Sequence, residues 1–526
     1  MTVILVIILG YVIKHTLIHP NHLTDNLYNK GVILRSTTAR PGILLETSYL
    51  HWYFEVSDIV RPEDWHRSLS LVIQRYFAQV SHGNELVTRL PHLLWTLLWL
   101  SAAGRIYSAI NRYTASGPGH LAICGLALTI AILVFNKWSV EILSGAYMDD
   151  VPGAAFALLG ILALMSPSPT SKNIAISAMM FGMAFLAKDI NLVWGIIGFL
   201  LVVIYILFSS IEKTPRAILS KLILYVSILL LVYGIKIAWN LHDLGTPLAT
   251  AARTALNARL LPGIQDGEHF LFIMHDKKVP GYLDIAQTVG WSAILKPGLT
   301  NLLWFLIDQI YTFALLVFSL ALWLLEKNRK TVNLFLLYTL TATGVYAIFF
   351  AFQLGEPAQT RYWLAPFSMM VIAFVSSITP TPNAPSPLPL RAIKTSMVLA
   401  ICLFAIRLAP DIIQEQKTVY SHAKPYNKQI YERISETVKP GESVLTHTNQ
   451  GVLIWSRFPY MKVVAVKPHH LTTLNEEEFK QMRDKYNITT IVFSTEDNLD
   501  GLFDLLRKTG FKTLNEFSPD VIFIYE

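Results

Sequence analysis

Two adjacent carboxylates stand at the start of an apolar segment near the middle of the first half of the chain. Asp149 and Asp150 follow Ser144-Gly-Ala-Tyr-Met and lead through Val-Pro152 into the apolar stretch 153–165. A charge at the centre of a bilayer costs about 2.5–3.5 kcal/mol on insertion scales, so acids beside a membrane span usually serve a purpose. The alternative is that both only cap a helix, because acids favour helix N-termini and Pro152 suits a first turn.

The composition is that of a membrane protein. Of 526 residues, 53% are hydrophobic and only 15% are charged, against roughly 25% charged in soluble domains. Apolar runs predict about eleven transmembrane helices, and therefore a polytopic α-helical membrane protein. These spans lie at about 1–19, 89–109, 118–136, 150–166, 172–188, 190–211, 217–240, 301–326, 331–353, 361–378 and 392–409.

Basic residues in alternate short loops fix the predicted orientation. With the N-terminus inside, every second loop is cytoplasmic, and those loops hold Arg105, Arg112, Lys172, Lys213, Arg216, Lys221, Lys327, Arg329, Lys330, Arg391 and Lys394. This agrees with the positive-inside rule, which also accounts for much of the net charge of +7 without a nucleic-acid partner. An odd number of spans places the C-terminus outside.

Charged residues near the outer ends of the spans then form one group. They are Asp25, Glu141, Asp149, Asp150, Lys188, Asp189, Lys236, Asp308, Glu356 and Arg361. Charges scattered at both interfaces would populate both sides, whereas here the acids gather on the outer side together with a few bases. The pattern favours a single polar site that faces outward.

Two outer loops, at about 20–88 and 241–300, could cover such a site. In the first, apolar residues between Trp65 and Val80 recur every three or four positions. This spacing predicts an amphipathic helix, which either lies in the headgroup layer or packs on its own loop.

The remainder of the chain predicts a different kind of structure. The segment 379–389 is a proline-rich linker, and from about residue 411 short strands and helices alternate. They predict a small extracytoplasmic α/β domain at 411–526, after a transmembrane domain at 1–410. The α/β segment lacks a glycine-rich nucleotide motif, and Cys124 and Cys402 lie in apolar runs, so no nucleotide, disulfide or cysteine metal site is predicted.

Several short motifs follow one another in a recognisable order. Asp25 and Tyr28 come after the first span, Gly83-Asn-Glu-Leu-Val-Thr-Arg89-Leu-Pro enters the second, and Met148-Asp-Asp-Val-Pro opens the fourth. Ala187-Lys188-Asp189 ends the fifth, and Arg361-Tyr362-Trp-Leu-Ala-Pro opens the tenth. Over residues 1–410 this order resembles the GT-C class of membrane glycosyltransferases. The resemblance is to the bacterial branch of the dolichyl-phosphate-mannose protein mannosyltransferase family, including the aminoarabinose transferases that act on lipid A. One departure is Asn26 after Asp25, where the family usually has Glu.

The resemblance implies transfer of a sugar from a polyprenyl-phosphate donor to a glycan-lipid or protein acceptor, with inversion, on the outer face of a membrane. Asp25 would accept the proton of the acceptor hydroxyl, and Asp149 or Asp150 would orient the acceptor or a metal. Arg89, Lys188, Arg361 and Tyr362 would hold the donor phosphate. No cofactor or metal site is identified, although a divalent metal stays open, and the bacterial inner membrane with a periplasmic C-terminal domain is the expected location.

Two other classes of function compete with this interpretation. A lipid or glycan transporter or flippase tends to carry internal repeats and polar residues at the bilayer midplane, whereas this sequence shows no clear repeat and its charges gather at one face. A scaffold whose outer domain binds a partner leaves the placement of Asp149, Asp150 and Arg361 unexplained.

Overall fold

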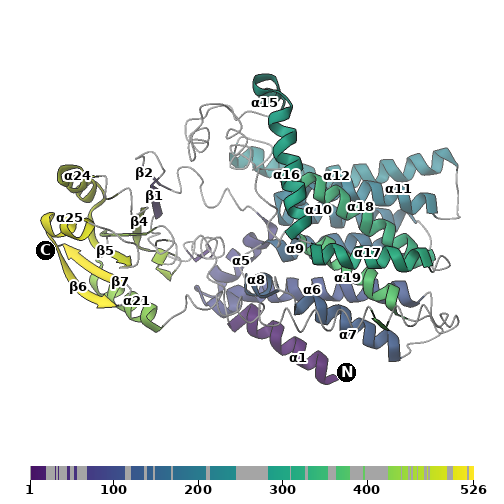
Figure 1. Cartoon of the computed structure of the whole chain (residues 1–526), viewed down its shortest axis with the longest axis horizontal. Helices are drawn as coiled ribbons and strands as arrows, with labels where there is room; N and C mark the ends of the chain where they lie inside the picture. Colours follow the sequence, from purple (N-terminus) through teal and green to yellow (C-terminus); the bar gives the residue numbers. More distant parts are fainter. Residues whose placement is uncertain are drawn as a thin grey trace.

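The computed structural model describes a helical part and a strand-rich part, at opposite ends of the molecule (Figure 1). The described residues are 2–18, 30, 33–34, 44–47, 53–55, 68–112, 120–135, 139–145, 149–166, 170–208, 214–244, 282–308, 310–325, 330–352, 363–379, 395–396, 425–439, 441–447, 451, 454–455, 457–458, 460–466, 471, 474–494, 501–517 and 520–525.

The helices follow the predicted apolar segments closely. They are α1 (Thr2–Ile13), the π-helical turn η1 (Lys14–Ile18), α5 (Leu69–Val80), α6 (Glu85–Arg112), α7 (His120–Val134), α8 (Ser139–Ser144), α9 (Asp150–Ala163), α10 (Ser171–Ala187), the 3₁₀ turn η2 (Asp189–Leu192), α11 (Val193–Phe208), α12 (Pro215–Leu244), α15 (Tyr282–Val289), α16 (Ser292–Asp308), α17 (Ile310–Leu325), α18 (Lys330–Phe352) and α19 (Leu364–Ile378).

Three of these helices are long and apolar enough to cross a membrane, over Glu85–Asn111, Pro215–Trp239 and Thr331–Phe349. Seven shorter apolar helices accompany them in the described part of the chain. Almost all of the predicted span 392–409 lies outside the described residues, so the count of about eleven stays a prediction.

Helices α9 and α19 form the centre of the helical part. Almost all of α9 is buried, and every residue of α19 from Leu364 to Ser377 is buried as well. Trp99 of α6 donates a hydrogen bond from Nε1 to the Oγ of Ser368 at 2.9 Å, which ties α6 to α19. A helix that is apolar on all sides and covered on all sides belongs at the core of a bundle.

One predicted span was wrong. The segment 301–326 was expected to be a single helix after an outer loop, but α16 begins at Ser292 and ends at Asp308, and a separate helix α17 begins at Ile310. The predicted outer loop at about 241–300 included Pro297, and proline removes a helical hydrogen bond. Here Pro297 lies in the second turn of α16, and the helix continues through it despite the missing hydrogen bond.

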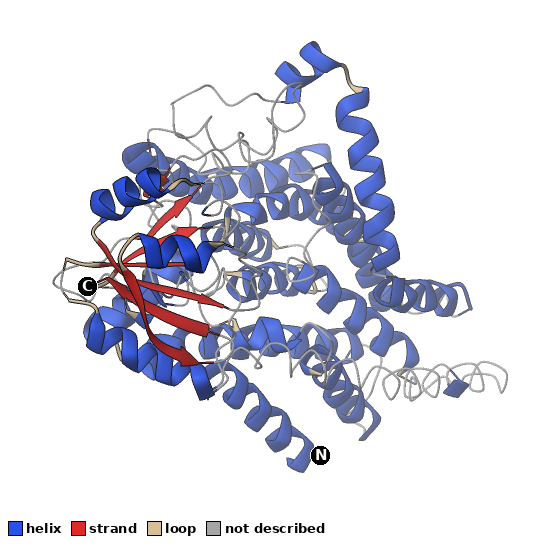
Figure 2. Cartoon of the chain, turned by 60° about the vertical axis from the view of Figure 1, so that its left-hand side comes forward, coloured by secondary structure: helices blue, strands red, loops and turns tan. Residues whose placement is uncertain are grey.

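The strands form one seven-stranded sheet with the order β2-β1-β4-β3-β5-β7-β6 (Figure 2). Five strands come from the C-terminal part: β3 (Ser443–His447), β4 (Lys462–Val466), β5 (Ile488–Ser494), β6 (Phe511–Phe517) and β7 (Asp520–Tyr525). The parallel pairs β3–β4 and β3–β5 and the antiparallel pairs β5–β7 and β6–β7 confirm the predicted strands and add β6.

Alternating side chains of the sheet build two apolar cores, one on each face. Leu445, Val464 and Phe493 pack with helices α24 (Glu476–Tyr486) and α25 (Leu502–Lys508). Val444, Val463 and Val492 pack on the other face with helix α21 (Pro425–Thr437). The period of two along each strand therefore gives three layers, with helices covering both faces.

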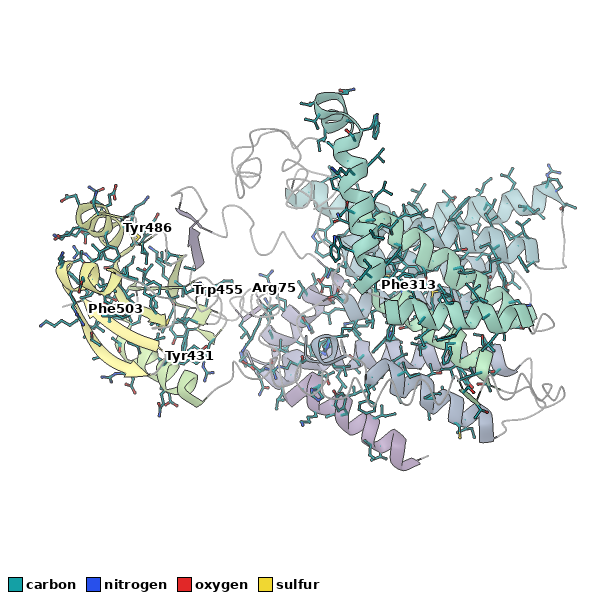
Figure 3. All side chains as sticks on the ribbon, in the orientation of Figure 1. Arg75, Phe313, Tyr431, Trp455, Tyr486 and Phe503 are labelled. Atoms are coloured by element: carbon teal, nitrogen blue, oxygen red, sulfur yellow. The ribbon has the colours of Figure 1, made fainter. Side chains whose placement is uncertain are left out.

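The other two strands come from the first outer loop. Strand β1 (Leu44–Thr47) pairs in parallel with β4, and β2 (Tyr53–Glu55) pairs antiparallel with β1 at the edge of the sheet. The loop that precedes α5 is therefore joined by backbone hydrogen bonds to the C-terminal part. In Figure 3, Arg75 of α5 and Trp455 of the C-terminal part lie in the region between the two ends of the molecule.

Candidate functional site

The two adjacent acids lie at the N-terminus of α9, and both are buried, with exposed fractions of 2% for Asp149 and 8% for Asp150. Asp149 occupies the N-cap position, but its side chain makes no capping hydrogen bond to the helix. Capping therefore does not explain the Asp149 carboxylate. Its bonds instead run to a distant part of the chain.

Asp149 holds helix α5 against α9. Its Oδ1 accepts hydrogen bonds from the hydroxyl groups of Ser68, at 2.7 Å, and of Ser70. Ser68 is also the N-cap of α5 and accepts a hydrogen bond from the backbone N–H of Leu71. The carboxylate thus connects the beginning of α5 to the beginning of α9.

This contact explains how the amphipathic helix α5 is oriented. Its polar residues Ser70 and Gln74 are buried against the protein, whereas Val72 and Tyr76 are 41% and 64% exposed. Val72, Tyr76 and Val80 thus face outward, as the headgroup-layer interpretation expects, whereas Leu71 and Ala78 pack with Ile33 of the preceding loop, as the other interpretation expects. On the polar side, Ser70 donates a hydrogen bond to the Asp149 carboxylate.

Burial raises the pKa of the Asp149 carboxyl to about 6, even though Lys188 and the two serine hydroxyls favour its charged form. Asp149 precedes the apolar helix rather than lying within it. A carboxyl that titrates near neutral pH can accept a proton from a hydroxyl more readily than an ordinary aspartate, because a general base works best near the operating pH.

Asp150 forms an ion pair with Lys188, with the Lys188 Nζ 2.6 Å from the Asp150 Oδ1. Both side chains are largely buried, at 13% and 5% exposure. Lys188 is the residue at which α10 ends and η2 begins, in an extended conformation that turns the chain back toward α9. The structure therefore brings together three of the predicted site residues.

The close approach of η2 to α9 depends on Gly153. A Cβ at this position would collide with the side-chain amide of Asn191, which is buried in η2 and donates to the carbonyl of Ala184 at 3.1 Å. The sequence Asp-Asp-Val-Pro-Gly therefore supplies both the acids and the space beside them. A larger residue at position 153 would have to displace the Asn191 amide from its place beside α9.

A buried lysine near this site belongs to the predicted group of outer charges, but the sequence predicts no role of its own for it. Lys236 of α12 is 2% exposed, and its Nζ lies 5.9 Å from the ring centroid of Trp239. One turn earlier on α12, the hydroxyl of Tyr233 donates to the carbonyl of Leu192 in η2 at 3.0 Å. The signal in the sequence is a single lysine within an otherwise apolar helix, since such a charge is costly in a membrane.

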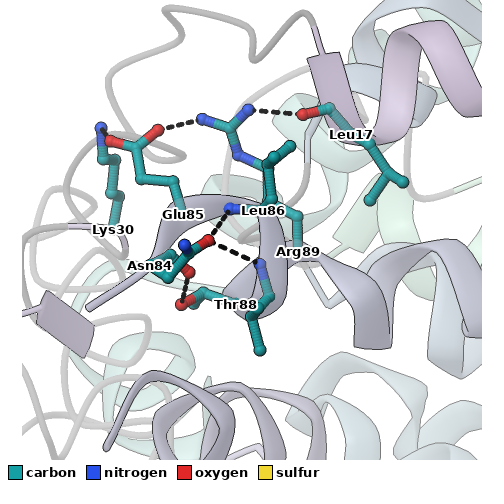
Figure 4. Close-up of polar contacts among 8 residues, drawn as sticks. Leu17, Lys30, Asn84, Glu85, Leu86, Thr88 and Arg89 are labelled. Atoms are coloured by element: carbon teal, nitrogen blue, oxygen red, sulfur yellow. Dashed lines mark hydrogen bonds and ion pairs between the residues drawn. The ribbon is translucent and has the colours of Figure 1, made fainter. Parts of the chain in front are cut away.

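Arg89 belongs to a second ionic cluster, at the beginning of α6 (Figure 4). Its Nη1 donates to the carbonyl of Leu17 at 2.8 Å, and its Nη2 pairs with Glu85, which also pairs with Lys30. Burial lowers the pKa of Lys30, against the attraction of Glu85. Both terminal nitrogens of Arg89 are thus engaged, and its phosphate-binding role stays a prediction.

His92 lies between the two clusters. It follows Arg89 by one turn on α6, is 1% exposed, and its Nε2 is 3.1 Å from the carbonyl oxygen of Leu143 in α8. The carboxylate of Asp150 interacts electrostatically with the same imidazole. Helix α6 therefore carries one ionic cluster at its first turn and borders the acidic site one turn later.

The other predicted site residues, Asp25, Arg361 and Tyr362, lie outside the described residues. The neighbouring Trp363 is described and is 3% exposed, with its ring centroid 5.2 Å from that of Tyr346. Within the described ranges, no group of three or more His, Cys, Asp or Glu side chains is arranged to hold a metal ion.

The structure is similar to two solved structures. For the archaeal oligosaccharyltransferase AglB from Archaeoglobus fulgidus, in complex with an inhibitory peptide and a dolichol-phosphate, the TM-score is 0.51 at 11% identity, over 100% of this chain and 74% of that one. For ArnT from Cupriavidus metallidurans, bound to undecaprenyl phosphate, the TM-score is 0.50 at 11% identity, over 99% of this chain and 97% of that one.

No family model and no curated protein matches the sequence. The similarity therefore lies in the three-dimensional arrangement of the helices and the C-terminal strands, over nearly the whole chain. The fold that the order of the sequence motifs predicts is confirmed: the chain has the fold of the GT-C class of membrane glycosyltransferases.

Proposed function

We propose that this protein is an integral-membrane glycosyltransferase that moves a sugar from a polyprenyl-phosphate-linked donor to a hydroxyl of a glycan-lipid or protein acceptor. The observation that carries the proposal is the buried pair Asp149–Asp150 with Lys188 at the entrance of α9, in a chain with the GT-C fold. Buried charges at a helix end, beside a membrane, are costly to keep and are typical of a functional site.

The donor is proposed from two kinds of support. AglB and ArnT were solved with dolichol-phosphate and undecaprenyl phosphate respectively. In this chain, Lys188 and Lys236 are cations on neighbouring elements, 13% and 2% exposed, and Arg361 and Tyr362 are added by the sequence resemblance. Cations of this kind would bind the donor phosphate and stabilise the negative charge that it gains on leaving.

The transfer is an inverting displacement. The acceptor oxygen forms a bond to the anomeric carbon, the bond from that carbon to the phosphate oxygen breaks, and its electron pair leaves with the polyprenyl phosphate. The proton of the acceptor hydroxyl passes to a carboxylate on the opposite face of the sugar. We assign this carboxylate to Asp25, with Asp149 as the second candidate because its pKa lies near 6.

The remaining residues position these groups. Asp150 holds the ammonium of Lys188 beside α9. Arg89 fixes the end of the first helix through the carbonyl of Leu17. We further propose a transmembrane domain at 1–410 and a periplasmic domain at 411–526, in a bacterial inner membrane, with the site on the periplasmic side.

A deletion strain tests the proposal. Loss of the gene should remove one sugar from the cell-envelope glycans or glycoproteins seen by mass spectrometry, and the polyprenyl-phosphate sugar should accumulate. Wild-type protein and the exposed-site control Asp504→Asn should restore the sugar, whereas Asp150→Asn at equal protein level should not. An unchanged glycan profile, with a lipid or glycan instead retained on the inner leaflet, would favour a transporter and refute the proposal.

A further inference from the structure

A cavity of about 690 Å³ opens at the far end of α6, away from the acidic site, between α6, α7 and α9. Arg105 lines it and lies 13 residues after His92, the α6 residue that borders the acidic site, which is about 20 Å along a helix that rises 1.5 Å per residue. This is about two thirds of the roughly 30 Å thickness of the hydrocarbon core of a bilayer. The cavity therefore lies toward the membrane surface opposite to Asp149 and Asp150.

The cavity is lined by polar residues on one side and by apolar residues on the other. Arg105 and Ser101 are exposed residues one turn apart on α6, and within the described chain Arg105 has no ion pair or hydrogen-bond partner. Leu126 and Ile130 of α7 and Leu162 of α9 form the apolar walls. A cationic end beside an apolar groove is complementary to an anionic headgroup with an acyl chain.

The surroundings indicate which leaflet the groove faces. Arg105 lies at the membrane end that the positive-inside rule predicts to be cytoplasmic, where the loops carry most of the Lys and Arg residues, including Lys172 and Arg216. Anionic lipids are attracted to such basic segments, and basic pockets between transmembrane helices on the cytoplasmic side are a known mode of anionic lipid binding. The groove is far from the proposed transfer site, and its role does not depend on that function.

We propose that this groove binds one anionic glycerophospholipid of the cytoplasmic leaflet. The lipid phosphate accepts hydrogen bonds from the guanidinium of Arg105 and the hydroxyl of Ser101, and an acyl chain lies along Leu126, Ile130 and Leu162. A second copy of the chain would be a poorer occupant, because a packed helix would cover Arg105 without supplying a counter-charge. A lipid phosphate supplies that charge together with acceptors for a bidentate contact.

Native mass spectrometry of the full-length protein in detergent tests the assignment. Titration with phosphatidylglycerol should show one tightly retained lipid, and phosphatidylcholine should bind more weakly. Arg105→Gln should weaken phosphatidylglycerol binding about fivefold or more, as expected for the loss of one cation at a membrane surface. The matched control is Arg216→Gln, an exposed arginine at the same membrane end outside the groove, and it should leave that lipid in place.

A groove-filling variant separates the occupants. Ser101→Trp places a large side chain in the cavity and should remove the retained lipid while Arg105 stays intact. Equal lipid binding by wild type and Arg105→Gln, or equal loss in Arg216→Gln, would overturn the proposal. So would a Ser101→Trp variant that keeps the lipid but converts a dimer into a monomer, because the groove would then be a protein interface.

Discussion

The replacement Asp149→Asn changes the pH dependence of stability in a predictable direction. The folded protein holds the pKa of this carboxyl at about 6, against an ordinary value of 3.8, mainly because the group is buried. Two pKa units correspond to about 3 kcal/mol. Between about pH 4 and pH 6 the folded protein binds this proton more tightly than the unfolded chain, so the free energy of unfolding falls as the pH rises.

An amide at position 149 keeps an oxygen that can accept the hydrogen bonds of Ser68 and Ser70 but has no proton to lose. The free energy of unfolding of the variant should therefore not fall between about pH 4 and pH 6 as that of the wild type does. Relative to wild type, Asp149→Asn should gain up to about 3 kcal/mol between pH 4 and pH 7, and most of the gain should come below pH 6.5.

Chemical unfolding in mild detergent, followed by tryptophan fluorescence at several pH values, measures this difference. Subtracting the two curves cancels the other titrating groups that both proteins share. The control Asp504→Asn removes a carboxylate that is 74% exposed, and it should give a nearly flat difference. A difference between Asp149→Asn and wild type that is also flat from pH 4 to pH 7 would refute the buried, serine-bonded position of Asp149.

Two further predictions concern the ion pair and the topology. Lys188→Met leaves the buried carboxylate of Asp150 without its cation and should lower the free energy of unfolding by about 3–5 kcal/mol. The double variant Lys188→Met with Asp150→Asn should recover most of this loss, because no buried charge is then left unpaired. If the effects of the two single changes simply add, Lys188 and Asp150 do not form an ion pair. A reporter that is active only in the exported compartment should be active when fused after Glu526 and inactive when inserted near Lys327, and activity near Lys327 would reverse the proposed orientation.

The helical part could be predicted largely from apolar run length. The spans predicted at 172–188 and 331–353 became α10 (Ser171–Ala187) and α18 (Lys330–Phe352), within one residue at either end. This works because a helix in a membrane must satisfy its backbone within itself, so local composition decides its position. The same rule failed at Asp308, where two helices follow each other without a change in hydropathy.

Contacts between distant segments could not be predicted in this way. The bonds from Ser68 and Ser70 to Asp149 join residues about 80 positions apart, and strand β1 pairs with β4 across most of the chain. Periodicity describes which side of an element is polar, but it carries no information about the partner. The two acids were found from the sequence because charges beside an apolar run stand out, whereas the serines that donate to Asp149 are ordinary polar residues.

The central claim is that the acids at the entrance of α9 and in the first outer loop carry out sugar transfer. An in vitro assay with a polyprenyl-phosphate sugar and an acceptor, applied to Asp25→Asn, Asp149→Asn and Asp150→Asn in parallel, tests it most directly. The variant that removes the general base should lower turnover about 10²–10⁴-fold while donor binding is retained, and the product should have inverted configuration at the anomeric carbon. Turnover above about a tenth of wild type in all three variants would contradict the account.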